Sequence, residues 1–149
     1  MKTVDEINWL DPADRITQRF TVHEALWLPS WRTYAVPTAE QKANVVAMAA
    51  RMEMVRSFVN APIHVHCWLR PKDYNATIKG SSPNSAHIEG KAVDFHVGAS
   101  VGADTCARVR RIVEPLLDVW KLRMEDHDGP WIHLDCRDVP PGGKRFFKP

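Results

Sequence analysis

The stretch that decides the fold is "SAHIEGKAVDFHV" (Ser85–Val97), which runs from a polar bend into an apolar strand. From Lys91 onward apolar and polar residues alternate, so the strand presents valine and phenylalanine side chains on one face and Asp94 on the other. A carboxylate inside a sheet needs a partner, because burying an unpaired charge is costly. Gly90 permits a sharp bend that returns His87 to the face of Asp94. The pattern therefore predicts half of a metal site.

A third ligand is expected from the late segment "WIHLD", in which His133 alternates with Ile132 and Leu134. Zinc accepts imidazole nitrogen and carboxylate oxygen, and a catalytic zinc site keeps three protein ligands and one position for water. Each residue taken singly also has a structural interpretation. His87 is then a surface loop histidine, and Asp94 is a capping or ion-paired carboxylate.

The composition is typical of one compact globular domain. The chain has 149 residues, of which 44% are hydrophobic and 26% are charged. Its net charge of +2 is too small to indicate a nucleic-acid partner. No apolar run reaches membrane-spanning length, and the first residues lack the apolar core of a signal peptide. We expect a monomer without a nucleic-acid or membrane partner.

The three cysteines are Cys67, Cys106 and Cys136, and no two of them form a C-x-x-C pair. An odd, scattered set of this kind indicates reduced thiols rather than a disulfide framework. The expected place of synthesis is therefore the cytosol.

The organisation of the chain predicts a single α+β domain over residues 1–149. Residues 1–37 are expected to form an irregular N-terminal wrap with short helical turns, and residues 138–149 a Pro- and Gly-rich tail. The clearest helix is Thr38–Val59, whose apolar residues recur at helical spacing and whose Thr38 and Gln41 match a capping box.

Three other segments carry strand patterns. Residues 63–69 alternate Ile63, Val65, Cys67 and Leu69 with His64, His66 and Trp68. A closing hairpin is expected from residues 121–125 and 131–137. A helix is expected over residues 103–120, and Pro115 should kink it or end it early. Residues 71–84 are loop by composition. The expected architecture is a small antiparallel sheet that carries the metal site and is flanked by helices.

The bend and strand resemble the zinc-ligand signature of the D-alanyl-D-alanine carboxypeptidase / L-alanyl-D-glutamate endopeptidase family. That signature is S-x-H-x-x-G-x-A-x-D, and it is met by Ser85, His87, Gly90, Ala92 and Asp94. Members are zinc peptidases of bacterial cell walls and phage lysis proteins. The resemblance implies a Hedgehog/DD-peptidase-like fold and one Zn²⁺ per chain, held by His87, Asp94 and His133.

Two further elements resemble the same family. "CWLRPKDYN" matches at Arg70, Tyr74 and Asn75, and "WIHLD" resembles the strand that carries the last histidine ligand. The resemblance implies that Arg70 binds a substrate carboxylate or stabilises the oxyanion, since its guanidinium binds carboxylates in a bidentate manner. It also implies that Tyr74 contacts substrate. Ser85 either hydrogen-bonds substrate or only shapes the turn before His87. The chain departs from the family where Cys67, Trp68 and Leu69 replace the usual Ser-Gly-Tyr.

A second departure concerns the general base, because Pro130 stands where many relatives carry a catalytic acid. The local candidates are Glu125, His127 and Asp128. Pro130 has no N–H to close a two-residue turn, so we expect a three-residue loop from Asp128 to Pro130. That register places Glu125 opposite His133, which favours Glu125 as the base and leaves Asp128 and His127 as alternatives.

Other polar residues receive structural interpretations. Arg123 is expected opposite Asp135 as a cross-strand ion pair, with Asp135 also able to orient a metal ligand. His64 and His66 share one strand face, and we expect them to flank the cleft or hydrogen-bond locally rather than bind a second metal.

The sequence therefore predicts a zinc-dependent peptidase that hydrolyses peptidoglycan stem peptides. The activity is that of a D-Ala-D-Ala carboxypeptidase or an L-Ala-D-Glu endopeptidase, in a phage lysis enzyme that stays cytoplasmic until it is released onto the cell wall. The alternative is a catalytically inactive, zinc-bearing module that binds cell wall or protein, and Pro130 is its main support. The residues leave open which bond is cut and whether the origin is phage or bacterial.

Overall fold

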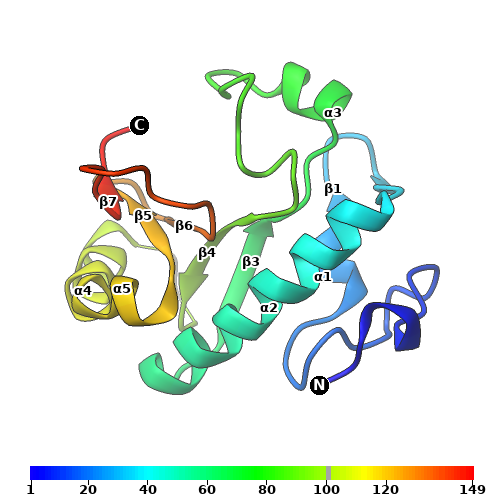
Figure 1. Ribbon diagram of the computed structural model, residues 1–149, viewed down its shortest axis with the longest axis horizontal. Coiled ribbons are helices and arrows are strands. Elements are labelled where there is room, and N and C mark those ends of the chain that lie inside the picture. The colour runs from blue at the N-terminus through cyan, green and yellow to red at the C-terminus, as the bar shows by residue number, and fades with distance from the viewer. Residues whose placement is uncertain (100–101) are drawn as a thin grey trace.

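The computed structural model describes residues 1–99 and 102–149, which form a five-stranded sheet, a two-stranded ribbon and several helices (Figure 1). The helical elements are η1 (Val4–Glu6), α1 (Val22–Leu26), α2 (Ala39–Val59), α3 (Lys72–Thr77), α4 (Ala103–Val113), η2 (Glu114–Leu116) and α5 (Leu117–Trp120). The strands are β1 (Trp27–Leu28), β2 (Thr33–Tyr34), β3 (Ile63–Cys67), β4 (Ala92–Val97), β5 (Arg123–Glu125), β6 (Ile132–Asp135) and β7 (Phe146–Phe147).

The larger sheet has the strand order β3-β4-β6-β5-β7. Its first four strands pair antiparallel, and β7 adds a parallel edge strand beside β5. The predicted α+β class with an antiparallel sheet flanked by helices is confirmed. Helix α2 runs across one face of the sheet, and α4 and α5 lie at the end near β5 and β7 (Figure 1).

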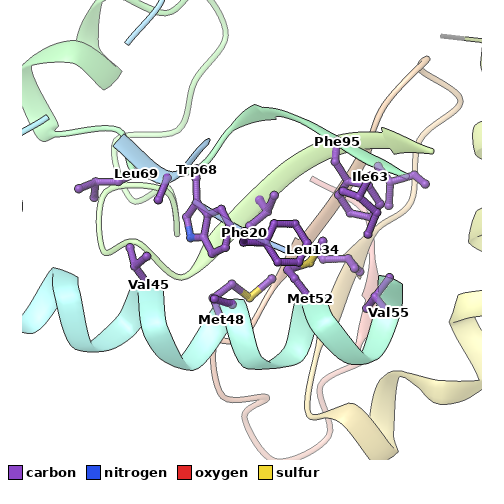
Figure 2. Packing of buried hydrophobic residues seen from close by; sticks show 14 of the residues in the cluster. Phe20, Val45, Met48, Met52, Val55, Ile63, Trp68, Leu69, Phe95 and Leu134 are labelled. Atoms are coloured by element: carbon purple, nitrogen blue, oxygen red, sulfur yellow. The ribbon is translucent and has the colours of Figure 1, made fainter. Parts of the chain in front are cut away.

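Helix α2 begins with the predicted capping box and buries its apolar side against the sheet. The Thr38 hydroxyl accepts a hydrogen bond from Gln41 N–H, and the Thr38 N–H donates to Gln41 Oε1 over 2.9 Å. Figure 2 shows the apolar stripe of α2 facing Phe20, Trp68 and Leu134: it consists of Val45, Met48, Met52 and Val55. Each such fully buried side chain stabilises the fold by roughly 1.5–3 kcal/mol.

Two short elements lie where the sequence indicated only loop and tail. Residues 71–84 contain α3, a short helix of six residues that begins with a 2.8 Å hydrogen bond from Asn75 N–H to Pro71 O. Residues 138–149 contain β7. The loop and tail predictions were incomplete at both places, because six helical residues or two strand residues are too few to show a period.

The structure confirms the predicted end of the helix near Pro115 and corrects the predicted loop of the closing hairpin. Helix α4 ends at Val113 and continues as η2 and α5, which confirms that the proline ends it early. The predicted register of the closing hairpin is confirmed, because Arg123 pairs with Asp135 and Met124 with Leu134. The predicted loop length is wrong, because strand pairing stops earlier and the connection between β5 and β6 spans residues 126–131. Arg110 holds this loop through its Nη2, which donates to Gly129 O over 2.8 Å and to Trp131 O. A buried side chain thus replaces the backbone turn that the prediction assumed.

The N-terminal segment contains short elements, as expected for a wrap. It holds η1, α1 and the β1–β2 ribbon, and its Ile16, Phe20 and Leu26 join the hydrophobic core. In the part of the chain that the structure describes, no helix is both long and apolar enough to cross a membrane.

Candidate metal centre and substrate cavity

The bend before β4 places His87 over the sheet as the sequence predicted. Gly90 has φ +75, and its N–H donates to His87 O over 3.1 Å, so the chain reverses within one turn. Side chains of α2 anchor this turn from below: Gln41 Nε2 donates to Ile88 O and Asn44 Nδ2 donates to Glu89 O, both over 2.9 Å. The helix that forms the core therefore also fixes the position of His87.

Sheet register brings the other two predicted ligands together. Asp94 of β4 is the direct cross-strand partner of His133 of β6. Their side chains point to the same face, because paired residues in antiparallel strands share a face of the sheet. His87 arrives over that face from the bend.

The three predicted ligands form a compact cluster. One donor atom from each of His87, Asp94 and His133 lies within 4.8 Å of the others. His133 Nδ1 lies 2.8 Å from Asp94 Oδ1, and His87 Nε2 lies 3.2 Å from Asp94 Oδ2. Both imidazoles are buried, whereas Asp94 is half-buried, so the cluster is only partly shielded from bulk water.

The donor chemistry of His87 fits a metal ligand. Its Nδ1 donates a hydrogen bond to Trp68 O over 2.7 Å, which fixes the tautomer and leaves a lone pair on Nε2. That Nε2 is buried and finds no hydrogen-bond partner in residues 1–99 and 102–149, since its contact with Asp94 lacks hydrogen-bond geometry. An orphaned imidazole nitrogen beside a carboxylate and a second imidazole is the N/O donor set that zinc accepts.

The electrostatics of the cluster also favour a cation. Burial opposes ionisation of Asp94, but the adjacent His87 and His133 outweigh it and hold the pKa of Asp94 far below its usual range. Burial lowers the pKa of His133, yet its hydrogen bonds with Asp135 and Asp94 outweigh this and raise the pKa to about 9. Without a metal, a proton on His133 balances two carboxylates, and a bound cation replaces that charge.

Asp135 and Arg123 support His133 from behind. Asp135 is fully buried and its Oδ2 lies 3.2 Å from His133 Nε2. Arg123 donates to Asp135 through Nε over 2.8 Å and Nη2 over 3.0 Å, which confirms the predicted cross-strand ion pair. A carboxylate on the outer nitrogen of a ligating histidine fixes the ring orientation and raises its basicity.

Cys67 lies close to the cluster without the chemistry of a ligand. It pairs across the sheet with Asp94, and its Sγ lies 3.8 Å from His87 Nδ1. Burial raises the pKa of the Cys67 thiol to about 12, so the thiol stays protonated at neutral pH. All three cysteines are free, as expected for reduced thiols.

A cavity of about 450 Å³ opens directly over the cluster. The predicted residues Arg70, Ser85, His87, Asp94, Glu125 and His133 all line it. Its wall also carries Lys79, Arg123, Arg137 and Lys148, so it presents more cationic than anionic side chains. Such a wall favours an anionic ligand.

Arg70 and Ser85 form one hydrogen-bonded unit at the cavity wall. Arg70 Nη2 donates to Ser85 Oγ over 3.2 Å, and the same oxygen accepts from His87 N–H over 3.3 Å. The Arg70 Nε is buried and has no partner in the described part of the chain. Because Arg70 also lines the cavity, its guanidinium can meet a ligand carboxylate there.

The three candidates for the general base, Glu125, His127 and Asp128, lie at different places relative to the cavity. Glu125 lines the cavity, whereas Asp128 is exposed on the 126–131 loop and does not lie among the described cavity residues. His127 is also outside that set: its ring packs on Trp131 at 4.5 Å between centroids, and its Nδ1 accepts from Gly129 N–H. The structure thus brings only Glu125 of the three to the cavity.

Tyr74 does not occupy the position that the resemblance implied. Its side chain is buried, its hydroxyl accepts a 2.9 Å hydrogen bond from Ser30 Oγ, and its ring packs edge-on against Trp31. Tyr74 is not among the described residues that line the cavity. Its role here is to fasten the N-terminal wrap to α3.

The histidines of β3 and β4 hydrogen-bond locally, as expected. His66 Nε2 lies 2.6 Å from His96 Nδ1, and His64 stacks on His96 with ring centroids 4.8 Å apart. His64 and His66 are exposed and His96 is half-buried, and none of the three is among the described residues that line the cavity.

Several cavity residues escaped the sequence analysis, namely Lys79, Arg137, Phe147 and Lys148. Arg137 follows His133 and Asp135 at a spacing of two, so strand alternation could have identified it. The others come from a loop and from the C-terminal segment, where no pattern in the sequence points to the cavity.

Comparison with known protein families gives one result. The family model described as Peptidase M15 matches residues 18–135. This range contains the cluster, Arg70, Ser85 and Glu125, and it ends before β7. Searches of curated proteins and of solved structures gave no match.

Proposed function

The chain belongs to the peptidase M15 family, and on that premise we propose that it hydrolyses stem peptides of peptidoglycan with one zinc ion per chain. M15 peptidases are zinc-dependent, and a zinc peptidase of the peptidoglycan-hydrolase type is the general function of the family. The cleaved bond, the site residues and the biological setting are the proposal.

The observation that carries this proposal is the convergence of two buried histidines and one half-buried aspartate at the floor of a cationic cavity. His87, Asp94 and His133 have the N/O donor set of zinc and come within 4.8 Å of one another. Glu125 and Arg70 stand in the wall of the same cavity. A metal site, a carboxylate base and an anion-binding guanidinium in one cavity are what peptide hydrolysis requires.

Each side chain has a separate role in the proposed reaction. When bound, zinc supplies Lewis-acid chemistry, since it activates water and polarises the scissile carbonyl. Glu125 takes a proton from the attacking water on its carboxylate and delivers it to the leaving amine, which keeps the proton count balanced. Asp135 holds the His133 ring in place, because its Oδ2 accepts from His133 Nε2.

Arg70 orients the substrate. Its Nη2 is held by Ser85 Oγ, and the other guanidinium donors are directed to a carboxylate of the stem peptide. The D-Ala-D-Ala and L-Ala-D-Glu bonds are both candidates for cleavage. We propose that the enzyme acts on the cell wall in phage lysis, after release from the cytoplasm.

Hydrolysis of purified sacculi tests the proposal. The wild-type chain should lower the turbidity of the suspension, a chelator should stop this, and added zinc should restore it. Mass spectrometry of the released peptides then identifies the cleaved bond. Sacculi that bind the protein but release no peptide, with or without zinc, would instead support the inactive binding module.

A further inference from the structure

The C-terminal strand β7 forms one wall of the cavity, although it lies beyond the range that the family model matches. Met124 N–H donates to Arg145 O and Asp126 N–H donates to Phe147 O, each over 2.6 Å. Lys148 Nζ lies 2.9 Å from Asp126 Oδ2 and adds an ion pair at the end of the strand. The residues of this segment that line the cavity are Phe147, Lys148 and Pro149.

Phe147 contacts the residues that support the metal cluster. Its ring centroid lies 4.5 Å from Arg123 Cζ, which is the geometry of a cation–π contact. The same ring lies edge-on to His133, with centroids 6.4 Å apart and an interplanar angle of 86°. One side chain of β7 thus contacts both a candidate ligand and the cation behind it.

These contacts continue without a gap to the metal cluster. Arg123 makes two hydrogen bonds with Asp135, and Asp135 accepts from His133 Nε2. An arginine side chain has many rotamers, and an aromatic face on its planar guanidinium restricts them. Restricting Arg123 keeps the Asp135 carboxylate, and through it the His133 ring, in one orientation.

We infer that Phe147 is a positioning residue of the metal centre, which it supports through Arg123 and Asp135. The inference rests on one part of the proposed function, namely that the cluster binds zinc. It adds that the last strand of the chain contributes to zinc affinity and hydrolysis, although the family match ends before it.

Phe146 provides the matched control. It precedes Phe147 on the same strand and is equally half-buried, but it pairs with Met124 and packs against the hydrophobic core. It does not line the cavity among the described residues. Replacing either phenylalanine by leucine removes a ring from β7, and only one of the two changes removes the contact with Arg123.

The test is a zinc competition titration against a chromophoric chelator, using the full chain. Phe147→Leu should weaken zinc binding about 3- to 10-fold, as expected when a support behind a ligand is lost. Phe147→Tyr keeps the aromatic face and should stay within about twofold of wild type, and so should Phe146→Leu. The absorption spectrum of bound Co²⁺ should change in Phe147→Leu alone.

Three results would overturn the inference. They are an unchanged zinc affinity in Phe147→Leu, an equal loss in Phe146→Leu, and a Phe147→Tyr variant as weak as Phe147→Leu. The titration needs no wall substrate, so it decides the role of Phe147 even if the wild-type chain hydrolyses no peptidoglycan. In an active enzyme, Phe147→Leu should lower kcat more than it raises KM, because Phe147 supports the centre as well as lining the cavity.

Discussion

Asp94 and His133 face each other across β4 and β6, with Asp94 Oδ1 2.8 Å from His133 Nδ1, although 39 residues separate them in the chain. The pair exists because of strand register. A slip of one residue would turn His133 to the opposite face of the sheet and dismantle the cluster. The centre is therefore as well ordered as the sheet that carries it.

Removing one ligand should abolish zinc binding. We expect the zinc content of His133→Ala to fall from one zinc per chain to none, because a catalytic zinc site needs three protein ligands and this change leaves two. Elemental analysis of the purified protein measures this. His64→Ala is the control, since it removes an exposed histidine from the same sheet face. Full zinc occupancy in His133→Ala would exclude His133 as a ligand.

Zinc binding should release a proton from His133 at neutral pH. The hydrogen bonds with Asp135 and Asp94 raise the pKa of His133 to about 9, so the metal-free protein holds this proton and the metal displaces it. Calorimetry in two buffers with different ionisation enthalpies measures the number of protons released. The number should fall by about one when the titration is repeated above pH 9, where the metal-free His133 has already lost this proton.

The same shift makes the stability of the metal-free protein depend on pH. Because the folded-state pKa of His133 lies above its ordinary value of 6.5, the stabilisation is fully present below that pH. It is lost as the pH rises toward 9. Urea denaturation of chelator-treated protein should show a falling free energy of unfolding across this interval. A free energy of unfolding that stays constant over this pH range would contradict the conclusion that a proton on His133 balances Asp94 and Asp135.

Glu125→Gln should keep zinc and lose activity by roughly 10²-fold or more, the usual scale for a general base. The amide preserves the size of the side chain but cannot take the proton of water. Asp128→Asn and His127→Gln are the controls, and both should retain most of the activity because neither side chain lines the cavity. An inactive Asp128→Asn with an active Glu125→Gln would assign the base to the 126–131 loop.

Arg70→Lys should lower the rate of wall hydrolysis about 10-fold or more, because lysine keeps the charge and loses the bidentate geometry. Circular dichroism and the zinc content should stay at wild-type values. Ser85→Ala removes the hydroxyl that accepts from Arg70 Nη2 and should produce a smaller loss of the same kind. Wild-type turbidity kinetics in Arg70→Lys would remove Arg70 from the site.

Arg123→Met should destabilise the protein by about 3 kcal/mol, because the fully buried Asp135 carboxylate loses its ion pair with Arg123 and keeps only His133 as a charged partner. Denaturant titration of the metal-free protein measures this loss. Lys121→Met is the control, since it removes one partner of the exposed Lys121–Asp118 pair and should change stability little. Equal stability of the two variants would show that Asp135 does not depend on Arg123.

Local patterns determined much of this protein from its sequence. The capping box and apolar period predicted α2, Pro115 predicted the end of α4, and alternation placed Asp94 on the polar face of β4. The Arg123–Asp135 pair also followed from the sequence, because register propagates with a period of two along a hairpin. These features depend on neighbours within a few residues, which a sequence displays directly.

Only the tertiary structure decided which distant side chains meet. Tyr74 matched the family pattern, yet its hydroxyl bonds to Ser30, which lies 44 residues away, and it stays out of the cavity. Phe147 carried no pattern at all, yet β7 brings its ring onto Arg123. Arg110 holds the carbonyls of the 126–131 loop, which is longer than the three-residue loop predicted from Pro130. Such contacts depend on packing between elements far apart in the chain, and no local period or propensity encodes them.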